Sequence, residues 1–283
     1  MIRSAQYAGS FYANRPDDLL ASLKHCFKGP FGPQKLPEDV EKIEKLAPFL
    51  LVPHAGYIYS GPVAAWSYLE LSKFTHPDTV IILGPNHTGF GAEIGVPKEV
   101  SVWSTPFGDV EIDHTIIDKM VNISKHISKN DLSHAREHSI EVQLPFLQFV
   151  LSEPFKLVPI SLLNQGLDTA ILLGEILSDI CLNENVVVIA SSDFSHYESH
   201  EIAKSKDSKV LKAIEKLDIK EMYDTKYSQN VSMCGHGPIG ATIEAAKKTN
   251  RTKSKILSYA TSGDVSGMKN QVVGYSAAAF YKE

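Results

Sequence analysis

The sequence predicts an α/β protein with a mixed, mainly parallel central sheet that is flanked by helices on both faces. Two observations predict this fold: short apolar runs rich in β-branched residues recur along the chain, and segments with helical spacing lie between them. Strands that alternate with helices in this way are typical of parallel sheets covered on both faces. No linker-like, repeated or low-complexity tract divides the sequence, so we expect residues 1–283 to form a single domain.

The expected strands are short, and they contain few residues that break a strand. They are 49–52, 79–83, 155–160, 185–190, 255–260 and 272–280. We expect the last two to pair antiparallel and to close the sheet near the C-terminus.

The expected helices have apolar residues at spacings of three to four. One is predicted to start at Gly61-Pro62, with proline at its first helical position. A second spans 138–151, where Pro145 should kink the helix or mark its first turn. Three further helices are expected: 166–181, 198–217 and one that starts at Gly237-Pro238.

Composition and charge exclude several classes of function. The chain has 28 basic and 33 acidic residues, a net charge of −5, and no dense basic run, so we expect no nucleic-acid partner. It has no signal-type apolar start and no run of about 18 apolar residues, which predicts a cytoplasmic protein with no membrane partner. Its three scattered cysteines predict free thiols in a reducing compartment.

Polar side chains follow three of the expected strands directly. His54 follows the first strand, and His87 follows the second. Asp193 and His196 follow the fourth. Because ligands of open α/β sheets bind beyond the carboxyl ends of the strands, we expect these side chains to share one crevice.

Cys234 offers a third metal ligand beside His54 and His87. Two imidazoles with one anionic ligand resemble the donor set of non-haem iron oxygenases, and two histidines with a thiolate also fit catalytic zinc or copper. The thiol precedes an expected helix start, whose N-terminus should lower its pKa and favour ligation over simple burial. Gly235 and Gly237 are expected to allow the tight turn there. The sequence therefore predicts a metal centre that is open on one side.

Further polar residues are candidates for proton transfer or support. His196 would act as general acid or base with Asp193 orienting it if that segment turns helically; alternatively, Asp193 caps the next helix. His236 would be a proton carrier or a hydrogen-bonding support of the ligands. The segment with Glu137, His138 and Glu141 is open to two interpretations, a supporting role at the site or a solvated, self-paired helix start.

With these residues assembled, the chain resembles the Memo family, which is also known as the B protein of the AmmeMemoRadiSam system. The resemblance covers nearly the whole length, with the matching segments in the family's order. They are AGSFY at 8–12, VPHAGYIYSGPVAA at 52–65, ILGPNHTG at 82–89, REHSIEVQLPFL at 136–147, SSDFSHY at 191–197 and CGHGPI at 234–239.

This resemblance implies a fold similar to that of class III extradiol dioxygenases, which hold Fe(II) with two histidines and a glutamate. By the resemblance, His54 and His87 correspond to the two histidine ligands, and Cys234 stands where those enzymes have the carboxylate. His196 corresponds to their acid/base histidine, and Asp193 lies beside the metal. The thiolate changes the properties of the metal, so the dioxygenase reaction does not follow from the fold.

Three functions therefore stay open for the chain. The first is a dioxygenase-like oxidoreductase that depends on Fe(II) or Cu and acts on an unidentified small or peptidyl substrate. The second is a zinc hydrolase with the same ligands. The third is a non-enzymatic module that binds an anionic peptide, such as a phosphopeptide, or a metabolite. The family resemblance also implies partners in a modification pathway, an AMMECR1-like protein and a radical SAM enzyme.

Overall fold

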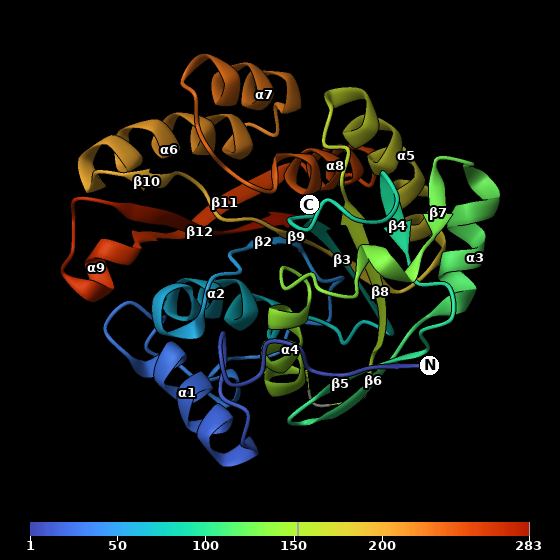
Figure 1. Cartoon of the computed structure of the whole chain (residues 1–283), viewed down its shortest axis with the longest axis horizontal. Helices are drawn as coiled ribbons and strands as arrows, with labels where there is room; N and C mark the ends of the chain where they lie inside the picture. The colour runs from blue at the N-terminus through green and yellow to red at the C-terminus, as the bar shows by residue number, and fades with distance from the viewer. Residues whose placement is uncertain (152, 283) are drawn as a thin grey trace.

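The computed structural model describes residues 1–151 and 153–282, which build one large sheet and one small sheet (Figure 1). The strands in this part of the chain are β1 (Ile2–Arg3), β2 (Phe49–Val52), β3 (Thr79–Pro85), β4 (Ile94–Val96), β5 (Val102–Thr105), β6 (Gly108–Glu111), β7 (Ile127–Lys129), β8 (Lys156–Leu162), β9 (Val186–Ser191), β10 (His196–Glu198), β11 (Lys253–Thr261) and β12 (Val272–Tyr281). Each strand expected from the sequence is present.

The large sheet has nine strands in the order β10-β12-β2-β9-β3-β8-β4-β7, with β11 paired to β12. Its centre, β2-β9-β3-β8, is parallel. On one side β12 pairs antiparallel with β2, β10 and β11, and on the other side β4 pairs antiparallel with β8. The central strands are buried because they are apolar on both faces, as parallel strands between helices must be. The expected mixed α/β sheet and its antiparallel C-terminal pair are confirmed.

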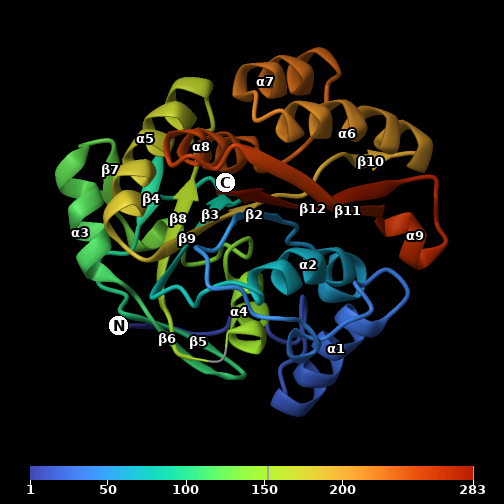
Figure 2. The same cartoon turned by 180° about the vertical axis from the view of Figure 1, so that it is seen from behind.

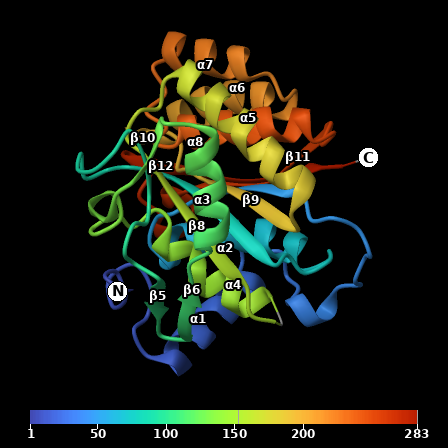
Figure 3. The same ribbon diagram turned by 90° about the vertical axis from the view of Figure 1, so that its right-hand side faces the viewer.

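Helices cover both faces of the large sheet. Along the described chain they are α1 (Pro16–Lys28), α2 (Tyr57–Leu71), α3 (His114–Ile123), α4 (Leu144–Val150), α5 (Leu167–Asn183), α6 (His200–Glu215), α7 (Ile219–Ser228), α8 (His236–Lys248) and α9 (Ser262–Ser266), with short 3-10 helices η1 (Pro37–Asp39), η2 (Asp131–Ser133) and η3 (Glu141–Gln143). The helices α5 to α8 lie on one face and α1, α2 and α4 on the other, which the rear and side views also show (Figures 2 and 3). No helix among the described residues has both the length and the apolar character needed to span a bilayer.

The starts of α2 and α4 can be compared with the helices that the sequence predicts. The helix expected at Gly61-Pro62 begins one turn earlier at Tyr57, so Pro62 lies inside it. The first turn forms because the Phe11 carbonyl accepts from the Tyr57 N–H, an anchor that is far away in sequence. The helix expected over 138–151 begins only at Leu144, directly after η3, so Pro145 lies in the first turn of α4, which is the second of its two expected placements.

The small sheet, β1-β5-β6, attaches the N-terminal segment to the body of the fold. β1 pairs parallel with β5, which places Arg3 opposite Trp103. Figure 1 shows this strand running under the large sheet toward α4. The N-terminal segment thereby reaches the loop that precedes α4, which carries residues of the site described next.

Candidate metal centre

The carboxyl ends of three neighbouring parallel strands bring the site together. His54 and His87 each stand two residues beyond the end of their strands, β2 and β3. Asp193 stands two residues beyond β9, which lies between those two strands in the sheet. The crevice predicted from the strand ends is thus a real convergence of side chains.

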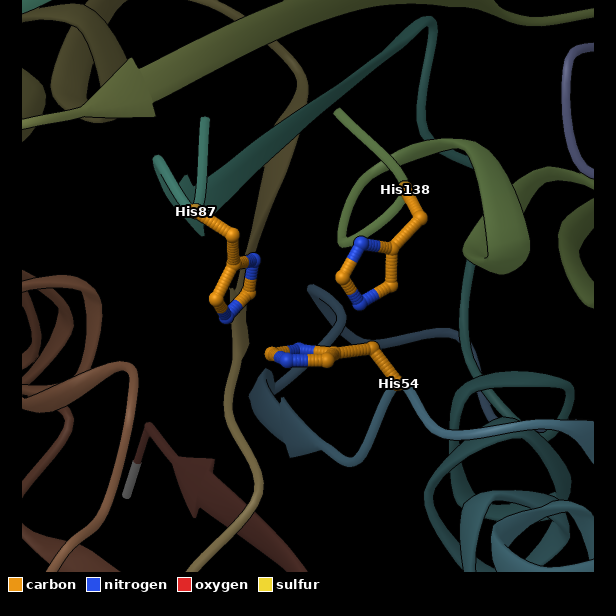
Figure 4. A group of neighbouring side chains, drawn as sticks. All are labelled: His54, His87 and His138. Atoms are coloured by element: carbon orange, nitrogen blue, oxygen red, sulfur yellow. The ribbon is translucent and has the colours of Figure 1, made fainter. Parts of the chain in front are cut away.

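His54, His87 and His138 form a compact cluster. One ring nitrogen of each lies within 4.8 Å of the others, a spacing that can hold one metal ion. The ring centroids of His87 and His138 are 4.7 Å apart in a stacked arrangement, and His54 lies edge-on to both at 5.3 and 5.4 Å. Figure 4 shows the three rings pointing toward one another from separate segments of the chain.

The hydrogen bonds of Ser191 decide which nitrogen of His54 carries the proton. Its Oγ lies 2.7 Å from the Ser139 carbonyl, which can only accept, and 2.8 Å from Gln143 Nε2, which can only donate. The Pro53 carbonyl, which can only accept, fixes that amide orientation because Gln143 Nε2 donates to it at 3.1 Å, and the Tyr68 hydroxyl then donates to Gln143 Oε1. Because the serine gives its one proton to Ser139, His54 Nδ1 at 2.9 Å must donate to Ser191. Nε2 of the neutral ring is therefore free to bind a metal ion.

The Glu137 carboxylate orients His87 in the same way. Oε2 accepts from the His87 backbone N–H at 2.6 Å, and Oε1 accepts from its Nδ1 at 2.9 Å and from the Ser139 N–H at 2.9 Å. His138 Nδ1 lies 3.4 Å from the same oxygen. Burial alone would raise the pKa of Glu137, but His87, the Ser139 N–H and His138 together outweigh it and lower this pKa to about 2. A carboxylate behind a ligand histidine is a common feature of metal sites.

Burial keeps two histidines of the cluster neutral. Loss of hydration lowers the pKa of His54 well below its ordinary value, and the neighbouring imidazoles lower it further. Burial likewise lowers the pKa of His138 to about 4, although Glu137 opposes the shift. Neutral imidazole is the form that binds metal ions, so these two rings are in the ligating state at neutral pH.

Cys234 reaches the same crevice from the loop before α8, but among the described residues the ligand atoms that all lie within 4.8 Å of one another are those of the three histidines, so ligation by Cys234 stays a prediction. Its Sγ lies 3.2 Å from His54 Nε2 and accepts from the Asp193 backbone N–H at 3.2 Å. Gln165, which follows β8, donates to the Cys234 carbonyl at 2.8 Å and holds the loop. Burial and the nearby Asp193 raise the pKa of the Cys234 thiol, so the lowered pKa expected from the helix start is wrong. A thiol in this place would bind a metal ion only as the thiolate, with its proton displaced by the ion and released.

Gly235 and Gly237 are required by space rather than by turn geometry. Gly235 has φ −111°, which any residue adopts, but a Cβ on it would lie 2.4 Å from the Ser191 carbonyl and 2.6 Å from Ser192 Cβ. A Cβ on Gly237 would lie 2.9 Å from Gln165 Cβ. Glycine is needed at both positions because the Cys234 loop closely approaches the ends of β8 and β9, and not because the turn requires the conformational freedom that we expected.

Asp193 and His196 both lie at the crevice, but they are oriented by other groups. Asp193 Oδ1 accepts from the His54 backbone N–H at 2.8 Å, and burial raises the pKa of this carboxyl to about 7. His196 Nδ1 lies 3.0 Å from the Ser232 carbonyl, so Nδ1 donates and Nε2 of the neutral ring carries the lone pair. The expected helical turn is absent from this segment because His196 begins β10, and Ser199, not Asp193, is the N-cap of α6. Proton transfer by His196 stays a prediction.

His236 begins α8 and packs edge-on against two tyrosines, with ring centroids 5.5 Å from Tyr223 and 6.2 Å from Tyr227. Its Nδ1 is buried and has no hydrogen-bond partner among residues 1–151 and 153–282. Burial, and then the charge of Lys226, lower the pKa of His236 to about 4. The ring is therefore neutral, and its expected function in proton transfer or support stays a prediction.

Sequence reasoning missed part of this site. The sequence leaves two interpretations open for the segment with Glu137 and His138; in the structure His138 joins the cluster, and Glu137 is the buried partner of His87. The signal was present in the segment REHSIEVQ, where acidic residues and histidine alternate within one turn. Ser191 and Gln143 gave no such signal, because their function depends on a contact between distant segments.

The fold and the cluster define a candidate metal-binding protein of the α/β class, with its donors at the carboxyl ends of a parallel sheet. A family model described as Memo-like protein matches residues 3–279. A MEMO1 family protein of Methanopyrus kandleri is 46% identical over 99% of both chains. A MEMO1 family protein of Methanocaldococcus jannaschii is 43% identical over 98% of both. The chain belongs to the Memo-like protein family.

A solved structure shares the fold at much lower sequence similarity. It is an uncharacterized protein from Escherichia coli K12, with a TM-score of 0.57 and 12% identity. The match covers 83% of this chain and 100% of that one. The likeness concerns the α/β fold alone and says nothing about a reaction.

Proposed function

We propose that this protein is a metal-dependent oxidoreductase, similar to the dioxygenases, that holds Fe(II) or Cu with His54, His87 and Cys234. The observation that carries the proposal is the hydrogen bonding of the two histidines. Ser191 and Glu137 accept from the Nδ1 atoms of His54 and His87, which leaves both Nε2 atoms available to one ion. The donor set of two imidazoles and one thiolate fits iron, copper and zinc.

The residues around the ion have separate tasks in this proposal. Asp193 holds the His54 backbone, and Gln165 holds the loop that carries the thiol. His196 accepts or gives a proton at Nε2, since its Nδ1 is engaged by the Ser232 carbonyl. A bound iron or copper ion would supply one-electron chemistry at an open coordination position. The substrate is a small molecule or a peptide whose identity is open.

A second function, zinc-dependent hydrolysis, is favoured by one specific observation. His138 completes a cluster of three histidines, which is the ligand set of a known class of catalytic zinc sites. In this alternative, His54, His87 and His138 bind the zinc ion, and Cys234 keeps its proton. His196 would then act as the general base toward a water molecule.

Metal analysis of protein purified without oxygen tests the two functions. The oxidoreductase proposal expects about one iron or copper ion per chain, and stoichiometric zinc without either would refute it. Cys234→Ser and His138→Ala then identify the third ligand, because the variant that removes a ligand should bind the metal at least tenfold more weakly. Full metal content in His54→Ala and His87→Ala would refute both proposals.

A further inference from the structure

Arg3 lies outside the metal cluster but hydrogen-bonds the loop that carries His138 of the cluster and Glu137, the partner of His87. Its Nε donates to the His134 carbonyl at 2.8 Å, and its Nη2 donates to the Glu137 carbonyl at 2.9 Å. Its Nη1 donates to Glu141 Oε2 at 2.5 Å. The three bonds span the loop from residue 134 to residue 141, which contains His138 and leads into α4.

This contact is buried, and both Arg3 and Glu141 make several hydrogen bonds in it. Arg3 is 6% exposed and Glu141 is 0% exposed, and the guanidinium lies 4.2 Å from the centre of the Trp103 ring. Glu141 also accepts from the Tyr7 backbone N–H and from the Tyr12 hydroxyl, both at 2.8 Å. A buried ion pair with this many hydrogen bonds has one geometry, so it fixes the loop relative to the N-terminal segment.

The loop in turn sets the orientation of a metal-site histidine. Glu137, whose backbone carbonyl is held by Arg3, uses both carboxylate oxygens on His87. A shift of this loop would therefore move the carboxylate that fixes the proton on His87 Nδ1. It would also move His138, whose ring stacks on His87.

We propose that Arg3 is a positioning residue of the metal centre, which acts through the 134–141 loop on Glu137 and His87. The inference rests on the proposed metal centre. It assigns to the N-terminal strand a task beyond pairing in the small sheet, because the planar guanidinium fork bonds three acceptors that a lysine cannot reach together.

The matched comparison is Arg3→Lys against Arg251→Lys. Arg251 is also buried, lies 3.8 Å from the centre of an aromatic ring, and donates to a hydroxyl and a backbone carbonyl, but it contacts none of the metal-site residues named above. Both lysine variants should lower the thermal midpoint. Only Arg3→Lys should weaken Co(II) binding, by about tenfold to a hundredfold in chelator competition, and change the visible Co(II) absorption bands.

The outcomes distinguish a failure of the Arg3 inference from a failure of the proposed metal centre. If the parent protein binds no Co(II), Zn(II) or Fe(II), the proposed function fails and the inference fails with it. If the parent binds Co(II) and folded Arg3→Lys binds it with equal affinity and the same spectrum, Arg3 is merely structural. Equal weakening in Arg251→Lys would also overturn the inference.

A milder variant covers the case in which Arg3→Lys does not fold. Tyr12→Phe removes one hydroxyl that donates to Glu141 and leaves every Arg3 bond in place. It should weaken Co(II) binding about threefold or more, since Glu141 then holds Arg3 less firmly. Unchanged Co(II) affinity in this folded variant would count against the positioning role.

Discussion

The pH dependence of metal binding should identify the third ligand. Burial raises the pKa of the Cys234 thiol, so the thiol is protonated in the metal-free protein at pH 7 to 8.5. If Cys234 ligates, each bound ion displaces one proton, and affinity should rise about tenfold per pH unit, or about 1.4 kcal/mol. If His138 is the ligand, no proton is displaced, because burial lowers its pKa to about 4.

The assay is competition between the protein and a chelator of known proton affinity for Co(II), at half-unit steps from pH 7 to 8.5. A slope near one in log affinity, together with a near-ultraviolet thiolate band, supports Cys234. The slope should fall to zero in Cys234→Ser and stay near one in His138→Ala. A parent slope of zero would refute ligation by the thiolate, and a slope that persists in Cys234→Ser would show that the proton comes from elsewhere.

Three further predictions concern the partner of His87, the loop that carries Cys234, and a buried carboxyl group on α6. Glu137→Gln should weaken Co(II) binding tenfold to a hundredfold, because an amide has one acceptor oxygen and cannot accept both bonds from His87. Glu70→Gln, a control away from the site, should leave the Co(II) affinity unchanged. Gly235→Ala should lower the free energy of unfolding by about 1–3 kcal/mol, since its Cβ would lie 2.4 Å from the Ser191 carbonyl; an unchanged urea midpoint would contradict this. Burial raises the pKa of Asp207 to about 6, although its hydrogen-bond donors act to lower it. Between about pH 4 and 6 the folded state therefore holds a proton that the unfolded state has lost. Stability should therefore fall across that window by about 3 kcal/mol more in the parent than in Asp207→Asn, as measured by urea unfolding at each pH.

The strands and two of the three clustered histidines were predictable because they depend on local pattern. An apolar β-branched run that ends in a histidine predicts both a buried strand and a side chain at the carboxyl edge of the sheet, as His54 and His87 confirm. The predicted start of α2 was wrong because Gly61-Pro62 is only a local signal. The helix begins where the Tyr57 N–H donates to the carbonyl of Phe11, which is distant in the sequence.

The remaining parts of the site depend on contacts between distant segments. Arg3 and His134 are separated by 131 positions, and Gln143 and Ser191 by 48. No spacing rule joins residues so far apart, so the sequence could not decide whether His138 faces solvent or the cluster. The need for glycine at 235 was readable, but its cause, a close approach to the end of β9, was not.

The choice of third ligand determines the chemistry that the crevice can support. Cys234 approaches from the loop before α8 and His138 from the loop before α4, and these two helices cover opposite faces of the sheet. If the ion takes the thiolate, His138 remains a neutral base beside it, and the thiolate would tune the redox potential of an iron or copper ion. If it takes the imidazole, Cys234 keeps a proton directed at His54 Nε2 and competes with the ion for that nitrogen. At 3.2 Å the contact between Cys234 Sγ and His54 Nε2 is a hydrogen bond that the neutral thiol donates, so an ion held by the three histidines must break it, whereas an ion held by the thiolate takes the place of its proton.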